Sequence, residues 1–191
     1  MPVIWKISAL ALTVGLLIGG APVGQGCNLK APDARLAGAD CARAWMDANL
    51  KLNDLMLVGT HNSYKTAIPP VVLAAIGERG KGLDYAHRPL VEQLDDGARQ
   101  LEIDVYYDPQ GGRFSHPMSV KLTGQPLEPW RAAALAEPGF KVLHVPDVDV
   151  LSACPTLVMC LETIRRWSLA HPDHAPILLM FNTKTDASPV P

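Results

Sequence analysis

The chain has 191 residues, of which 48% are apolar, and its formal net charge is −2. This length is sufficient for one domain with a hydrophobic core, and the apolar fraction excludes an intrinsically disordered chain. Lysine and arginine are scattered along the sequence, and no run of them forms a basic stripe. We therefore expect a globular domain without a nucleic-acid partner.

The N-terminal segment is typical of an exported protein. Lys6 precedes the apolar run ISALALTVGLLIGG, and the small, turn-prone residues APVGQGC follow that run. This order predicts a secretory signal peptide over residues 1–26, because the run is shorter than the roughly 20 residues that span a bilayer. A lipid anchor on Cys27 and an uncleaved membrane anchor are the alternatives. We expect the mature protein, residues 27–191, to be secreted or periplasmic.

The four cysteines fall into two local pairs, Cys27 with Cys41 and Cys154 with Cys160. Export to an oxidising compartment favours disulfides, and local pairing is one of the three connectivities that four cysteines allow. Neither spacing matches the short gap between the cysteines of a zinc knuckle, so a metal site is the weaker interpretation.

Alternating apolar runs predict the order of strands and helices. We expect strands over residues 55–61, 99–107, 140–146 and 175–184. We expect helices over residues 39–55, within 68–77, over 88–98 between Pro89 and Gly97, and over 154–172. Residues 108–113 predict a turn, and residues 118–139 are treated as irregular. Strands that alternate with helices indicate a mainly parallel α/β sheet.

Polar side chains lie at or near the ends of all four predicted strands. Ligands bind at the carboxyl ends of the strands in parallel sheets, whether the sheet is open or closed into a barrel. The polar residues in question are His61, Asn62, Glu102, Asp104, His144 and Asn182. Their recurrence at one predicted edge indicates a functional site.

The segment LEIDV places two carboxylates on one face of a strand. Glu102 and Asp104 are two residues apart, and side chains alternate between the faces of a strand. Two buried carboxylates that share a face repel each other, so a proton or a cation must neutralise them. Oxygen ligands suit Ca²⁺ or Mg²⁺. The alternative is a pair of structural carboxylates neutralised by Arg99 and Arg113.

His61 and His144 are candidates for acid–base catalysis. Each alone would be more typical of a core histidine bonded to a backbone carbonyl, but the two flank the acidic pair at strand ends. Together with a metal ion, two imidazoles suit phosphodiester cleavage. His116 competes with His144 for the second role, and we prefer His144 because it ends a predicted strand.

Several motifs together resemble one enzyme family. GTHNSY, LEIDVYYDPQGG, VLHVPDVD and the cysteine-flanked helix before HPDHAPILLMFN are similar to the calcium-dependent phosphoinositide-specific phospholipase C family of bacteria and fungi. That family belongs to the wider group of TIM-barrel phosphodiesterases. The resemblance runs from about residue 52 to about residue 186.

The resemblance implies a (β/α)₈ barrel that cleaves an inositol phospholipid with Ca²⁺. The inositol 2-hydroxyl would attack phosphorus, diacylglycerol would leave, and a cyclic inositol phosphate would form at a transiently contacted membrane surface. The resemblance assigns catalysis to His61 and His144, calcium binding to Asn62, Glu102 and Asp104, and phosphate contacts to Tyr64 and Lys65.

The sequence departs from the family pattern in two ways. Asn182 stands where related eukaryotic enzymes have a glutamate as fourth calcium ligand, and a neutral amide should bind calcium less tightly. A full barrel takes about 250 residues, whereas residues 27–191 offer only four strands, the N-terminal half. We expect either a truncated gene product, which we favour, or self-association of two copies through the open sheet edges. A glycerophosphodiester phosphodiesterase and a non-catalytic remnant that keeps the cation site are the alternative functions.

Overall fold

The computed structural model describes residues 27, 29–30 and 38–185, and these divide into two compact units at residues 56 and 57. The predicted signal peptide lies outside the described residues. Among the helices of the described part, none is both long enough and apolar enough to cross a membrane.

The first unit holds helix α1 (Ala39–Asn49) and a short 3₁₀ helix η2 (Leu52–Asp54). A disulfide joins Cys27 to Cys41, as the local pairing predicted. The second predicted pair is also confirmed, since Cys154 is bonded to Cys160 in the second unit.

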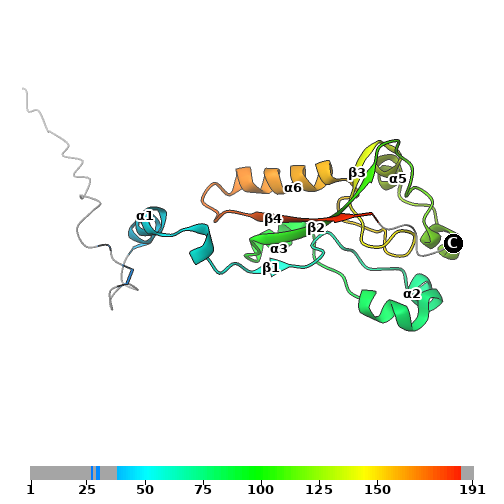
Figure 1. The fold of residues 1–191 in the computed structure, drawn as a ribbon, viewed down its shortest axis with the longest axis horizontal. Coiled ribbons are helices and arrows are strands. Elements are labelled where there is room, and N and C mark those ends of the chain that lie inside the picture. The colour runs from blue at the N-terminus through cyan, green and yellow to red at the C-terminus, as the bar shows by residue number, and fades with distance from the viewer. Residues whose placement is uncertain (1–26, 28, 31–37, 186–191) are drawn as a thin grey trace, which may run out of the picture. The chain divides into compact units, whose positions relative to one another are not determined.

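The second unit is built on an open four-stranded sheet with β2 (Gln100–Asp108) at its centre (Figure 1). Strand β4 (Leu178–Lys184) runs parallel to β2 along seven residues, with Asp104 opposite Asn182. Strand β1 (Gly59–Thr60) is also parallel to β2, and β3 (Gly139–Lys141) is antiparallel to it. Gln100 pairs with both β1 and β4, and Tyr106 with both β3 and β4, so β1 and β3 share the edge of β2 opposite β4.

Two of the expected strands were wrong in extent or direction. A strand was expected over residues 55–61, yet Met56 is 99% exposed and pairing to β2 covers only two residues. Gly59 itself permits this pairing, because a Cβ there would lie 2.9 Å from that of Gln100. The predicted parallel strand over 140–146 is the short antiparallel β3, so His144 lies in the loop that follows it.

The fold is therefore mixed α/β, with three parallel strands and one antiparallel strand in an open sheet. The (β/α)₈ architecture implied by the family resemblance stays a prediction.

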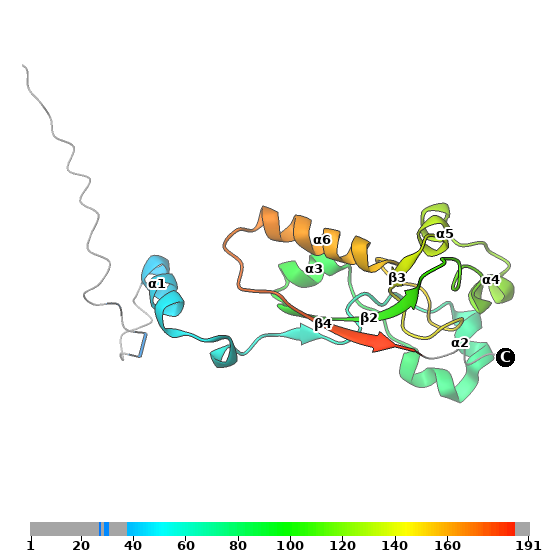
Figure 2. The same ribbon diagram turned by 45° about the horizontal axis from the view of Figure 1, so that its top comes forward.

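The second unit also contains several short helices and one longer one. They are α2 (Pro70–Ile76), η3 (Gly77–Leu83), α3 (Leu90–Asp95), α4 (Met118–Thr123), α5 (Pro129–Ala136) and α6 (Leu157–Ala170). The segment 118–139, expected to be irregular, contains α4 and α5. Short helices of this kind give weak periodicity, and α5 begins at a proline, which suits the first helical position. Figure 2 shows α3 and α6 on the same side of the sheet.

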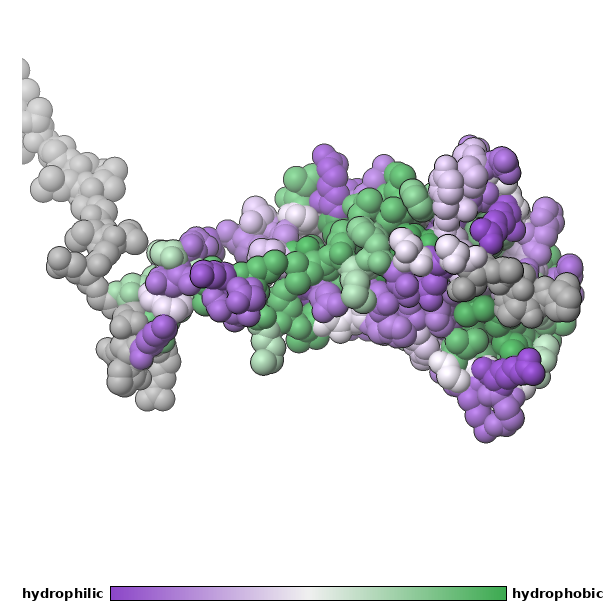
Figure 3. Space-filling view, in the orientation of Figure 1, coloured by the Kyte–Doolittle hydropathy of each residue, from purple (hydrophilic) through white to green (hydrophobic). Residues whose placement is uncertain are grey.

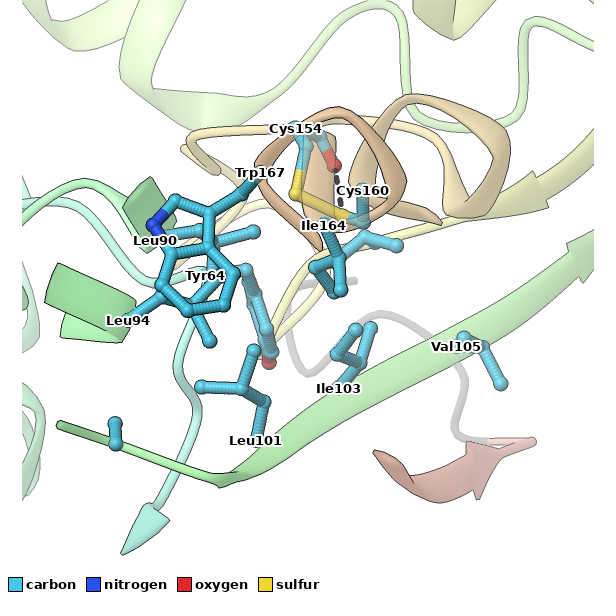
Figure 4. Packing of buried hydrophobic residues seen from close by; sticks show 12 residues of the cluster. Tyr64, Leu90, Leu94, Leu101, Ile103, Val105, Cys154, Cys160, Ile164 and Trp167 are labelled. Carbon is cyan, nitrogen blue, oxygen red and sulfur yellow. Dashed lines mark hydrogen bonds between the residues drawn. A yellow bond between two sulfur atoms is a disulfide. The ribbon is translucent and has the colours of Figure 1, made fainter. Parts of the chain in front are cut away.

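The main core lies between those two helices and the sheet (Figure 4). Leu101, Ile103 and Val105 point from β2 toward α3 and α6, whose Leu94 and Ile164 meet them. The alternation along β2 sends its carboxylates to the opposite face. The core thus fixes which way Glu102 and Asp104 point.

A capping hydrogen bond and a disulfide stabilise the N-terminus of α6. Thr156 caps the helix, its hydroxyl oxygen accepting a hydrogen bond from the Met159 amide at 3.2 Å, and the Cys154–Cys160 disulfide closes the loop before the first turn. Packing by Cys160, Ile164 and Trp167 then holds the helix on the sheet.

Apolar side chains also gather on the surface over the middle of the second unit, where Figure 1 places β4 (Figure 3). Met180 and Phe181 of β4 are each nearly half exposed. In the described part of the chain, β4 pairs with β2 alone. The far edge of β4 is therefore an open sheet edge.

Candidate active site

The turn after β1 presents the first group of site residues. Asn62 has a left-handed backbone, φ 50°, a conformation that asparagine tolerates better than most residues. The turn is bonded to β2, because the Ser63 amide donates to the Glu102 carbonyl at 3.0 Å and the Ser63 hydroxyl accepts from the Glu102 amide at 2.9 Å. The sequence THNS therefore turns sharply while staying anchored to the strand that carries the carboxylates.

His61 projects from this turn beside Glu102. Its Nε2 lies 3.6 Å from a Glu102 carboxylate oxygen, and the imidazole is 71% exposed. The His87 Nε2–H donates to the His61 carbonyl at 2.7 Å, and this hydrogen bond stabilises the turn. The Tyr85 ring stacks near the His61 ring, with centroids 6.5 Å apart. His61 is thus held by its backbone while its ring remains open to a ligand.

Polar groups line one face of the sheet where β2 and β4 run side by side. Glu102 and Asp104 share that face with Asn182, which lies opposite Asp104 in the register, and with Lys184 two residues further on. Asp104 is fully buried, and the Lys184 ammonium lies 3.3 Å from its carboxylate. The structure therefore brings three of the four predicted calcium ligands onto one face.

The fourth predicted ligand, Asn62, approaches the same group from the turn. The Asn62 amide N–H lies 3.4 Å from a Glu102 carboxylate oxygen. Its side-chain amide donates to the Tyr85 hydroxyl at 2.7 Å, and its side-chain oxygen receives only a long hydrogen bond, 3.4 Å, from Tyr64. That oxygen is the part of Asn62 that a cation would use.

His144 is positioned by a buried acid. Its Nδ1 lies 2.9 Å from the Asp149 carboxylate, and its carbonyl accepts from the Tyr106 hydroxyl at 3.2 Å. A tight backbone turn between Val145 and Asp149 brings the acid back to the imidazole. Donation from Nδ1–H to the carboxylate leaves Nε2 as the free nitrogen, the arrangement of a histidine oriented for proton transfer.

Asp149 also pairs with Lys65. The Lys65 ammonium lies 3.3 Å from the same Asp149 oxygen, and both side chains are fully buried. Lys65 donates in addition to the Tyr85 carbonyl at 2.6 Å and lies over the Tyr85 ring. A buried ion pair of this kind is tolerated because further hydrogen bonds satisfy the ammonium.

These contacts connect the two imidazoles through one continuous network. His61 contacts Glu102, which contacts the backbone amide of Asn62. The Asn62 side chain contacts the Tyr85 hydroxyl, and the Tyr85 carbonyl contacts Lys65. Lys65 then pairs with Asp149, which contacts His144. A bridge between Lys65 and Ser152 fastens the turn after β1 to the loop after β3. The described contacts therefore connect both histidines to one set of polar side chains.

Two tyrosines that contact Asn62, Tyr64 and Tyr85, are held in the neutral form. Burial, followed by the negative charge of Asp104, raises the pKa of Tyr64. Burial also raises the pKa of Tyr85, although the hydrogen bond with Asn62 acts in the opposite direction. Both hydroxyls therefore remain hydrogen-bond donors at neutral pH.

The residues expected to hold calcium fit that ion in their chemistry. Both Asp104 oxygens are buried and accept no hydrogen bond of ordinary geometry, as expected for a carboxylate prepared for a cation. In the described part of the chain, no three His, Cys, Asp or Glu side chains form a group that could hold a metal on their own. The amides of Asn62 and Asn182 would have to complete the ligand set.

Three further candidate residues lie away from the exposed rim of His61 or outside the network. Tyr64 and Lys65, expected near a phosphate, are fully buried, so contact with a substrate would require their surroundings to open. His116 is exposed after a turn, and no described contact joins it to the network. Sequence reasoning missed Asp149, Tyr85 and Lys184. The acid five residues after His144 was the one available signal, whereas nothing in the sequence pointed to Tyr85 or Lys184.

The turn after β1, the strands β2 and β4 and the loop after β3 thus bring imidazoles, carboxylates and a buried lysine together within one α/β unit. A family model described as phosphoinositide phospholipase C, Ca²⁺-dependent, matches residues 50–190. The chain therefore belongs to the calcium-dependent phosphoinositide phospholipase C family. No curated protein and no solved structure matches it.

Proposed function

We propose that this protein cleaves the phosphodiester bond of an inositol phospholipid with the help of Ca²⁺, releasing diacylglycerol and an inositol phosphate. Family membership supports the reaction class. The observation that carries the proposal for this chain is the network that links His61 and His144 through Glu102, Asn62, Tyr85, Lys65 and Asp149.

The two histidines divide the work of moving protons and balancing charge. His61 lies at the exposed rim, where its imidazole would stand beside the attacked phosphate and stabilise the charge that develops on it. His144, oriented by Asp149, would donate a proton to the phosphoryl group or to the departing diacylglycerol oxygen. The inositol 2-hydroxyl would transfer its proton to the Glu102 carboxylate beside His61 as it attacks phosphorus. The bond from phosphorus to the glycerol oxygen would break as that oxygen takes the Nε2 proton of the protonated His144 ring.

Calcium would be held by Asn62, Glu102, Asp104 and Asn182. When bound, the ion would lower the pKa of the attacking hydroxyl and offset charge on the phosphoryl oxygens. Because two of these four ligands are neutral amides, we expect weaker binding than at a site with a third carboxylate.

Lys65 and Tyr64 act from within the protein. Lys65 fixes Asp149, and through it the ring of His144. Tyr64 lies between Asn62 and Asp104, where its neutral hydroxyl stays a donor. In this arrangement both are positioning residues.

An apolar cavity supports a lipid substrate. It has a volume of about 350 Å³, and Val145, the residue that follows His144 in the sequence, is one of its lining residues. Its lining combines apolar side chains with one arginine: Ala75, Ile76, Arg79, Leu83, Met118, Val145 and Val148. The cavity would accept the glycerol or upper acyl part of the substrate while the phosphate stays at the histidines.

The expected setting is outside the cytoplasm, at a membrane surface contacted only during turnover. The two disulfides are compatible with an oxidising compartment. Export through a signal peptide over residues 1–26, and self-association through the open sheet edges, stay predictions.

The test compares two substrates with and without calcium. Purified protein is incubated with phosphatidylinositol vesicles or with glycerophosphoinositol, in calcium or in a chelator, and the products are identified by ³¹P NMR. We expect cyclic inositol phosphate from the vesicles in calcium alone. Preferential cleavage of glycerophosphoinositol would instead indicate a glycerophosphodiester phosphodiesterase. No product from either substrate would indicate a binding module without turnover.

A further inference from the structure

We propose that the ammonium of Lys184 is a resident counter-cation of Asp104, which a divalent cation must displace in order to bind. Lys184 thereby sets the metal affinity of the site. This inference rests on the calcium site of the proposed function and adds to it a competing group supplied by the protein itself.

The geometry places Lys184 over the predicted ligands. Lys184 and Asn182 are two residues apart on β4, so their side chains share the face that carries Asp104. Lys184 is opposite Tyr106 in the register, and its long side chain brings the ammonium to 3.3 Å from an oxygen of Asp104, the residue opposite Asn182. The ammonium therefore stands where a cation bound to Asp104 and Asn182 would stand.

One carboxylate in this position cannot serve both cations. Calcium bonds to carboxylate oxygens at about 2.3–2.6 Å, which would bring a double positive charge close to the ammonium. Because Asp104 is fully buried, water screens little of the resulting repulsion. Binding of the metal and the Lys184–Asp104 ion pair therefore compete for the same carboxylate.

The Lys184 ammonium can move away from its carboxylate partner more readily than the ammonium groups of the buried lysines Lys65 and Lys141. Lys65 and Lys141 are fully buried, and each also donates to a backbone carbonyl. The Lys184 side chain is 23% exposed, and the described residues offer its ammonium the Asp104 carboxylate without a carbonyl acceptor. A flexible four-carbon stem at the edge of solvent allows the ammonium to move into water when calcium arrives.

Calcium affinities measured by isothermal titration calorimetry at one fixed pH test the inference. The wild-type protein is compared with Lys184→Met, with Lys184→Arg, which keeps the positive charge, and with Lys81→Met, which removes an exposed lysine paired with Glu78. We expect Lys184→Met to bind calcium about tenfold more tightly or better, because the competing cation is gone. Lys184→Arg should stay near the wild-type affinity, as should Lys81→Met.

The outcomes separate this inference from the calcium site itself. Equal or weaker binding by Lys184→Met, with measurable binding by the wild-type protein, overturns the role of Lys184 alone. No binding by either protein overturns the calcium site and this inference together. Lys184→Gln serves as a second uncharged variant, with folding checked by circular dichroism. If neither uncharged variant folds, the ammonium is a structural requirement and the exchange is contradicted.

Discussion

At the scale of single residues, Asp149 is the group on which the candidate site depends most. Its one carboxylate holds the His144 ring and balances the buried charge of Lys65. Removing one partner of a buried ion pair leaves an uncompensated charge, and that costs more than the pair contributes when intact. The position of His144 and the stability of this region are therefore linked.

Asp149→Asn should lower the free energy of unfolding by about 3–5 kcal/mol, because it leaves the Lys65 ammonium buried without a counter-charge. Urea unfolding at neutral pH measures the change. Lys81→Met is the control, since its ion pair with Glu78 is exposed and should be worth less than about 1 kcal/mol. Equal stability of Asp149→Asn and the wild-type protein would show that Lys65 finds another partner.

Tyr64 should make stability fall at alkaline pH. Burial, and then the Asp104 charge, raise its pKa above the ordinary value of 10.0. Above that pH the unfolded chain loses the Tyr64 proton while the folded chain keeps it. The folded state then binds more protons, so stability decreases with pH by up to about 1.4 kcal/mol per unit, whereas below pH 10 this effect vanishes.

Urea unfolding of the wild-type protein and of Tyr64→Phe at several pH values between 8 and 11 tests this. The phenylalanine variant should lose less stability between pH 10 and 11 than the wild-type protein. Parallel curves for the two proteins would contradict the raised pKa.

At the scale of elements, α6 determines how β2 presents its carboxylates. The inward side of α6 carries Cys160, Ile164 and Trp167, which pack on the apolar face of β2. Leu161 and Leu169 are also apolar, yet both are exposed. The helix therefore contacts the sheet through a narrower stripe than its sequence suggested.

This packing predicts different costs for two substitutions in the same helix. Ile164→Ala removes a side chain buried against the sheet and should destabilise the protein by about 2–5 kcal/mol. Leu169→Ala removes a side chain that is 66% exposed and should have little effect. Thermal and urea unfolding of both variants measure the difference. Similar losses would mean that α6 packs by another face.

The elements that sequence reasoning predicted are those with strong local signals. β2 alternates regularly, α3 starts at Pro89 and is followed by Gly97 in a left-handed conformation, and β4 is an unbroken apolar run. The direction of β3 could not be predicted in the same way, because an apolar segment of a few residues is compatible with either direction of pairing. The extent of β1 could not be predicted either, because it depends on how many residues pair with β2 in the folded protein.

The candidate site was predictable where it follows from backbone geometry. Alternation places Glu102 and Asp104 on one face, and the parallel register brings Asn182 beside Asp104. The reach of long side chains was not predictable. Lys184 and Lys65 find their carboxylates across the fold, and no spacing in the sequence reports those contacts.

At the scale of the whole molecule, the candidate site lies entirely within the second unit. It draws on the turn after β1, the segment around Tyr85, the facing strands β2 and β4, and the loop after β3. In the described part of the chain, β4 leaves one sheet edge open. Met180 and Phe181 of this strand are partly exposed. The residues of the candidate site come from these described strands, turns and loops.

The most direct test of the account is calcium-dependent turnover of phosphatidylinositol by three alanine variants, His61→Ala, His144→Ala and His116→Ala. Loss of a group that transfers protons or stabilises charge should lower the rate at least about a hundredfold in the first two. His116→Ala should stay near the wild-type rate, because His116 is exposed outside the network. Rates within a few-fold of wild type for His61→Ala and His144→Ala would contradict the account.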